Sequence, residues 1–294
     1  INGINPLSVT DYERVLIALT ALGIDGSKLD EYRTFYDQKG NVVTNLIASI
    51  QRFPESAMSI NSATFALLAF DSGKYEVKNG TWSRENLIQY LLKQQLADGG
   101  WNLQTSGAAD PDVTAMAISA LAPYTKDNKN VEDSVSKALA TLSKLQDKNG
   151  KYASYNTINS NSSAMVMIAL ASMGKDAAND EAFTKWSAGK QNSVLSGLLS
   201  FRISYSDEFG YDNNRIANAL STEQGLRALA SYRSYLYAKA AVQPYVFGKP
   251  DAPEKWEEEA VAVSLEIVRE PSKTTYQKGE KFEPSGLAVK VTFS

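Results

Sequence analysis

The stretch QLADGGWNLQTSGAADPDVTAMAISALA, residues 95–122, contains most of the features that recur along the chain. A glutamine is followed by a Gly-Gly pair and a tryptophan, then by a short acidic loop, and then by an alanine-rich apolar run. Small residues at helical spacing let a helix approach its neighbours closely, while adjacent apolar residues fill the core. The last third of this stretch therefore predicts a closely packed helix.

The alanine-rich part of the stretch belongs to a nine-residue register that occurs five times, at starting points 48, 51, 49 and 59 residues apart. The copies are VLIALTALG (15–23), ATFALLAFD (63–71), TAMAISALA (114–122), SAMVMIALA (163–171) and TEQGLRALA (222–230). Amphipathic segments lie between them, at residues 46–51, 86–95, 131–146 and 194–202, and each is expected to form a two-helix unit with the copy that follows it. A two-helix period of about 50 residues indicates a stacked or closed array.

We therefore expect an all-α fold over residues 1–245, an α/α toroid of five to six helical hairpins with inner and outer rings. The connections repeat as well, since Gln95-x-x-x-Gly99-x-Trp101 is echoed by residues 146–152, QDKNGKY. Glycine permits the positive φ that ends a helix sharply. The aromatic residue then covers the gap between repeats.

These motifs carry a family resemblance. Gln-x-x-x-Gly-x-Trp resembles the QW motif of squalene and hopene cyclases, and DGGW followed by DPDVTAMAISALA resembles the prenyltransferase/squalene-oxidase repeat family. TDYERVLIALTALG and NSATFALLAFDSGKY are similar to its bacterial extracellular branch, which is related to the α-domain of intrinsic factor and transcobalamin. The resemblance implies an α/α toroid, and it alone suggests corrinoid binding. The residues themselves predict no cofactor.

The helical pattern ends near residue 245, and prolines and glycine mark a linker over residues 246–260. Residues 261–268 and 288–293 alternate like strands. The sequence YQKGEKFEPSGLAVKVTFS resembles the opening of a bacterial Ig-like domain of the Big_3 kind, so residues 261–294 are interpreted as a truncated Ig-like domain. Its unpaired strand edges predict docking on the toroid or association with another chain. The resemblance implies an extracellular or cell-surface protein of a Gram-positive bacterium.

The composition excludes several classes of function. The chain has 294 residues with 30 basic and 33 acidic side chains, a net charge of −3 and no basic cluster, so nucleic acid is not expected as a partner. It contains neither cysteine nor histidine, two of the three residue types (Asp, Cys and His) that bind zinc in protein prenyltransferases, and no metal is predicted. No apolar run approaches the ~20 residues that span a bilayer.

The acidic loop before the third copy suggests one specific activity. Class II terpene cyclases protonate an alkene or epoxide with the middle Asp of a DxDD-Thr-Ala motif, a position that Asp112 occupies here. Such an acid must stay protonated, which requires a dry pocket and a second carboxyl group. Val113 replaces the last acid of the motif, so the motif is incomplete.

The repeats offer another interpretation of the same acid. Asp112 aligns with Asn61 and Asn161, each two residues before its register, where Asp and Asn are favoured N-caps. The helix dipole lowers the pKa of a capping carboxylate, the wrong direction for a general acid. We therefore favour capping over catalysis for Asp112. Asp110 has no acidic counterpart in the other repeats and is the residue to examine first.

Several loop residues are candidates for ligand binding. Residues near one expected end of the toroid would line a pocket for an apolar or planar ligand. These candidates are Trp82, Trp101, Asp110, Tyr152, Tyr155, Asn156 and Tyr211. For Trp101 and Tyr152, filling an inter-repeat gap is the favoured alternative.

Three functions remain open at this point. We favour a non-catalytic extracellular module that binds an unidentified small molecule or a surface protein through one mouth of the toroid. A second hypothesis is an isoprenoid-converting enzyme that uses Asp112 as its acid. A third is a glycan-active α/α barrel with paired carboxylates, for which Asp98, Asp110 and Asp112 are the candidates.

Overall fold

The computed structural model describes residues 8–31, 35–36, 40–204, 206–246, 262–269, 272–275 and 288–293. The chain divides into two compact units, residues 1–247 and residues 248–294, and each is described by itself. The fold is predominantly α-helical, and the described strands form only two-stranded sheets. An all-α toroid with a short β fragment is thus confirmed as the fold class.

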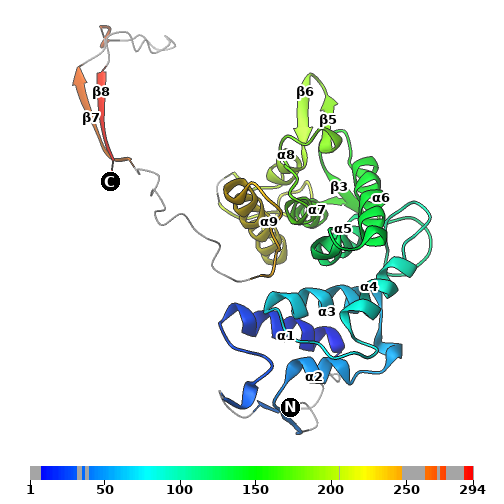
Figure 1. Ribbon diagram of the computed structural model, residues 1–294. Helices are drawn as coiled ribbons and strands as arrows, with labels where there is room; N and C mark the ends of the chain where they lie inside the picture. The colour runs from blue at the N-terminus through cyan, green and yellow to red at the C-terminus, as the bar shows by residue number, and fades with distance from the viewer. Residues whose placement is uncertain are drawn as a thin grey trace. The chain divides into compact units, whose positions relative to one another are not determined.

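Each of five helices contains all or most of one copy of the repeated register, as the sequence predicts. They are α1 (Val9–Ala21), α3 (Ile60–Ser72), α5 (Pro111–Leu121), α7 (Ser160–Ser172) and α9 (Ala219–Ala238). These inner helices pack in chain order, each against the next, whereas α1 and α9 share no such contact with each other. The inner row therefore has two end helices, α1 and α9, and Figure 1 shows the five inner helices.

Four outer helices cover the inner row. They are α2 (Leu46–Gln51), α4 (Arg84–Lys93), α6 (Lys129–Leu145) and α8 (Val194–Leu199). Each packs most extensively on the inner helix that precedes it, whereas the sequence grouped each with the inner helix that follows. Single 3-10 turns lie between these helices, at Leu29–Glu31, Glu55–Ala57, Ala122–Tyr124 and Glu181–Phe183.

Among the residues that the structure describes, the connections of the first unit contain three short antiparallel hairpins. They are β1 (Phe35–Tyr36) with β2 (Val42–Val43), β3 (Tyr152–Ser154) with β4 (Thr157–Asn159), and β5 (Thr184–Ser187) with β6 (Lys190–Ser193). The sequence analysis did not predict these hairpins. In the second and third of them, a two-residue turn with positive φ at both positions joins the strands, which is the type I′ geometry.

The repeated Gln-x-x-x-Gly-x-Trp motif joins neighbouring repeats. The Gln95 side-chain amide donates to the carbonyl of Gly99 and, at 2.8 Å, to that of Ser134 on α6. The Trp101 indole N–H donates to the Leu91 carbonyl at the end of α4, over 2.8 Å. The motif therefore ties α4 to α6 and to the loop that leads into α5.

The second unit contains β7 (Ala262–Arg269) and β8 (Ala288–Phe293), paired antiparallel with two register shifts. The linker expected over residues 246–260 lies outside the described residues apart from Val246. Among the helices that the structure describes, none combines the length and the apolar character needed to cross a membrane.

Candidate functional site

Polar side chains at the N-termini of four inner helices hold the backbone there. Ser59, Asp110, Asn159 and Asn218 are the N-cap residues of α3, α5, α7 and α9, and each side chain accepts from a free backbone N–H of the first turn. For α5, one Asp110 oxygen accepts from the amides of Asp112 (2.9 Å) and Val113 (3.1 Å). The cap is therefore Asp110, and the prediction that Asp112 caps this helix is wrong.

Asp112 lies inside the helix, one residue after the Pro111 that starts it. Burial raises the pKa of the Asp112 carboxyl to about 6. A hydrogen bond with Ser162 on α7 lowers this pKa, whereas the negative charge of Asp110 raises it further. The expectation of a lowered pKa is therefore wrong as well, because desolvation outweighs the helix dipole. One Asp112 carboxyl oxygen is buried without a hydrogen-bond partner.

Asp110 also joins the helix to the neighbouring hairpin. Its second carboxyl oxygen accepts from the Ser154 hydroxyl at the end of β3, at 2.5 Å. The loop before it is held by Asp98, whose carboxylate accepts from the amides of Gly100 (3.1 Å) and Ala109 (2.8 Å). Asp110 thus connects α5 to the hairpin before α7, while Asp98 holds together the loop that leads into α5.

The exchanged roles of the two acids predict opposite effects of substitution. Asp110→Ala should lower the free energy of unfolding by about 1–2 kcal/mol, because two helix amides and the Ser154 hydroxyl lose their acceptor. Asp112→Asn should raise it by about 1 kcal/mol at pH 7.5, because an amide does not ionise in a partly buried site. Urea unfolding at pH 7.5 measures both. If Asp112→Asn were the more destabilising change, Asp112 and not Asp110 would be the structural acid.

Three of the predicted ligand-binding residues are exposed in loops. Tyr155 and Asn156 form the turn between β3 and β4, with φ of 46° and 63°, and the Tyr155 side chain is 75% exposed. Tyr211 is 40% exposed, and its carbonyl accepts from the Ser160 amide at the start of α7, at 2.8 Å. Both loops are therefore anchored at the N-terminus of α7.

The other predicted aromatic residues do not reach the surface. The side chains of Trp82, Trp101 and Tyr152 are completely buried. The Trp82 indole donates to the Phe53 carbonyl at 2.9 Å, which connects the end of α2 to the start of α4. These three side chains fill gaps between repeats, and a ligand at the surface would not contact them.

Two further residues with functional chemistry were missed in the sequence. Glu13 on α1 is completely buried with both carboxyl oxygens unpartnered, and burial raises the pKa of this carboxyl to about 9, with Arg14 lowering and Asp11 raising it. It stands two residues before its register, as Asp112 does, so the repeat alignment contained the signal.

Trp186 on β5 is 72% exposed, and nothing in its sequence context distinguishes it from a buried tryptophan.

The arrangement offers hydrogen-bonding and aromatic contacts at an exposed face. Within the ranges that the structure describes, no three acidic side chains gather as metal ligands would, and the chain has no histidine or cysteine. Asp112 is the described acid of this face whose raised pKa suits proton donation. Tyr155, Asn156 and Tyr211 are suited to contact a ligand or a protein surface.

No protein-family model matches the sequence, and no curated protein matches it either. Among solved structures, the chain is similar to a chain of Candida albicans protein geranylgeranyltransferase-I complexed with GGPP, with a TM-score of 0.43 and 14% sequence identity. The alignment covers 72% of this chain and 57% of that chain, so the present chain matches little more than half of its length. At this degree of likeness, what that enzyme binds says nothing about what this chain binds.

Proposed function

We propose that the toroid is a non-catalytic binding module outside a bacterial cell, and that it takes its ligand or partner on the face formed by Tyr155, Asn156 and Tyr211. The observation that carries the proposal is the turn at Tyr155. A bulky, exposed tyrosine occupies left-handed backbone there, at the first position of a type I′ turn. Asn and Gly are the residues that this turn prefers.

Left-handed backbone at a non-glycine residue costs roughly 1–2 kcal/mol. A folding role would offset that cost by burying the side chain, but the Tyr155 ring is largely exposed. Strained residues that persist without a packing role are typical of binding sites. Exposed tyrosines on a rigid support also contribute strongly to recognition, because a large contact area is ordered at a small entropic cost.

The location outside the cell rests on the resemblance of residues 10–23 and 61–75 to the extracellular branch of the repeat family, and of the C-terminal residues to an Ig-like domain. A secreted module with two units joined in series fits the division of the chain at residue 247. The resemblance also makes corrinoids, isoprenoids and oligosaccharides the ligand classes to test first.

A thermal-shift screen with cobalamin, geranylgeranyl diphosphate and chito- and cello-oligosaccharides tests this function. A ligand at 100 times its Kd should add about 2.7 kcal/mol to the stability of the wild-type protein. The same ligand should give a much smaller shift with Tyr155→Ala or Tyr211→Ala. Tyr36→Ala is the control, because Tyr36 is also exposed but lies in a different hairpin. A ligand that stabilises all four proteins equally would contradict the proposed site.

The raised pKa of Asp112 supports a second candidate, an enzyme that protonates an isoprenoid alkene. This function requires Asp112→Asn to abolish turnover of squalene or a prenyl diphosphate without loss of folding. The incomplete motif at Val113 weighs against it. Unchanged turnover in Asp112→Asn, or no turnover in the wild-type protein, would reject the enzyme and leave the binding module.

A further inference from the structure

The segment that follows α9 returns across the ends of the other inner helices. We call residues 239–246 the strap. It begins at Lys239, where a φ of 49° ends α9, and the Val242 amide donates to the Ala171 carbonyl of α7 at 2.9 Å. Gly174 leaves room for it, because a Cβ there would lie 3.0 Å from the Ala241 nitrogen and its φ is +67°. The strap is therefore a fitted part of the fold.

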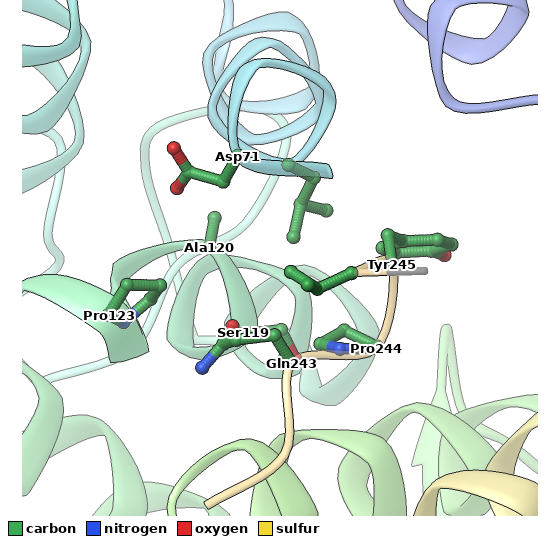
Figure 2. Close-up of a pocket in the computed structure, with 9 residues that line it drawn as sticks. Asp71, Ser119, Ala120, Pro123, Gln243, Pro244 and Tyr245 are labelled. Atoms are coloured by element: carbon green, nitrogen blue, oxygen red, sulfur yellow. The ribbon is translucent and has the colours of Figure 1, made fainter. Parts of the chain in front are cut away.

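The second half of the strap lies against α3 and α5. Figure 2 shows Gln243, Pro244 and Tyr245 beside Asp71, Ser119, Ala120 and Pro123. With Leu68, these last four residues form a groove from α3, α5 and the 3-10 turn that follows α5. The space left between strap and groove is about 10 Å³, enough for at most one water molecule. The strap therefore fills this groove almost completely.

Tyr245 is held by a charged side chain of α9. Its hydroxyl is hydrogen-bonded to the Arg227 guanidinium of α9, which also lies 5.6 Å from the ring centroid. Glu223 pairs with Arg227 at 3.1 Å and orients it. Burial raises the pKa of the Tyr245 hydroxyl, while the charges of Arg227 and of Arg14 on α1 oppose this. Tyr245 is thus fixed against α9 by Arg227.

We propose that this groove is a binding site for an extended peptide with a Gln-Pro-Tyr sequence, and that the chain occupies it with its own strap. The contacts are of the kinds used in peptide recognition: a main-chain hydrogen bond to α7, a lining of α3 and α5 side chains beside Pro244, and a tyrosine held by a hydrogen bond and a cation–π contact. Because the strap follows α9 directly, it occupies the groove within the same chain. A partner segment of the same chemistry would therefore compete with the strap for the groove.

The test uses the full-length chain with Tyr245→Ala, which weakens the strap but leaves the groove intact. A fluorescein-labelled peptide with the sequence of residues 239–246, KAAVQPYV, is titrated and its anisotropy measured. The Tyr245→Ala protein should bind this peptide at least tenfold more tightly than the wild-type protein does. Adding Arg227→Gln to Tyr245→Ala should abolish the gain, because the groove then lacks the side chain that recognises tyrosine.

Tyr237→Ala is the matched control, because Tyr237 makes the same kind of contact with Arg233, 5.5 Å from its centroid, on the exposed side of α9. This variant should behave like the wild-type protein, and a peptide with its tyrosine replaced by alanine should not bind Tyr245→Ala. Equal peptide binding by all variants, or no binding to a folded Tyr245→Ala protein at millimolar peptide, would overturn the proposal. The proposal would also be overturned if the wild-type protein were a dimer that the peptide converts to a monomer. The groove would then be occupied by the strap of a second copy.

Discussion

Glu13→Gln should stabilise the protein at neutral pH and have little effect in acid. Glu13 is completely buried without a hydrogen-bond partner, and burial raises the pKa of its carboxyl from 4.5 to about 9. Below pH 4.5 the group is protonated in both the folded and the unfolded state, so it does not affect stability. Between pH 4.5 and 9 the unfolded chain releases the proton and the folded chain keeps it, so stability falls as the pH rises.

The slope of this loss approaches 1.4 kcal/mol per pH unit, which amounts to about 3 kcal/mol between pH 4.5 and pH 7. The gain from Glu13→Gln should grow by about that amount over the same interval. Urea unfolding at pH 4.5 and pH 7 measures it, and comparing the two pH values cancels the intrinsic cost of the buried amide. Glu76→Gln is the control, because Glu76 is exposed. A gain that does not change with pH would contradict a protonated Glu13.

Trp101→Ala should lower the free energy of unfolding by about 4 kcal/mol. The Trp101 side chain is completely buried, so its removal leaves a large cavity between repeats, and the Leu91 carbonyl loses its donor. Trp101→Phe should cost roughly half as much, because the ring is largely retained. Denaturant unfolding measures both.

Trp186→Ala is the matched control for this prediction, since it deletes the same side chain from a position that is 72% exposed. It should change stability by less than about 0.5 kcal/mol. A Trp101→Ala variant that unfolds like Trp186→Ala would mean that the repeated aromatic residue does not seal the repeats.

The inner helices were predictable because small and apolar residues recur in one register, and packing against neighbours requires this pattern. The outer helices were found for the same reason, since their amphipathic stripes face the inner row. Which inner helix each outer helix covers was not predictable, because amphipathicity shows that a face is buried and not what buries it.

The capping error has a specific cause. Asp112 was aligned with Asn61 and Asn161, and all three are cap-type residues, but each lies one position inside its helix. The residues two positions earlier include Ser59 and Asp110, which also suit a cap. Ser59 is not acidic, so it was not recognised as the counterpart of Asp110. Hydroxyl, amide and carboxylate oxygens can all cap a helix.

Other features of the site depend on tertiary contacts. Burial of Glu13 follows from the packing around α1, and the exposure of Trp186 follows from the position of its hairpin. Residues 239–245 of the strap were assigned to the toroid and residue 246 to the linker, but their path was not predicted because this sequence has no periodicity. Its order comes from contacts with α7, α5 and α9, which a local pattern does not encode.

The central claim is that Tyr155, a residue unfavourable to the conformation of its turn, is present there because it contributes to binding. Unfolding free energies of the wild-type protein and of Tyr155→Asn/Asn156→Gly test it most directly, because the variant gives the turn the residues that it prefers. The account predicts that the variant is more stable by about 1 kcal/mol. A variant less stable than the wild-type protein would contradict the claim, since Tyr155 would then contribute to folding.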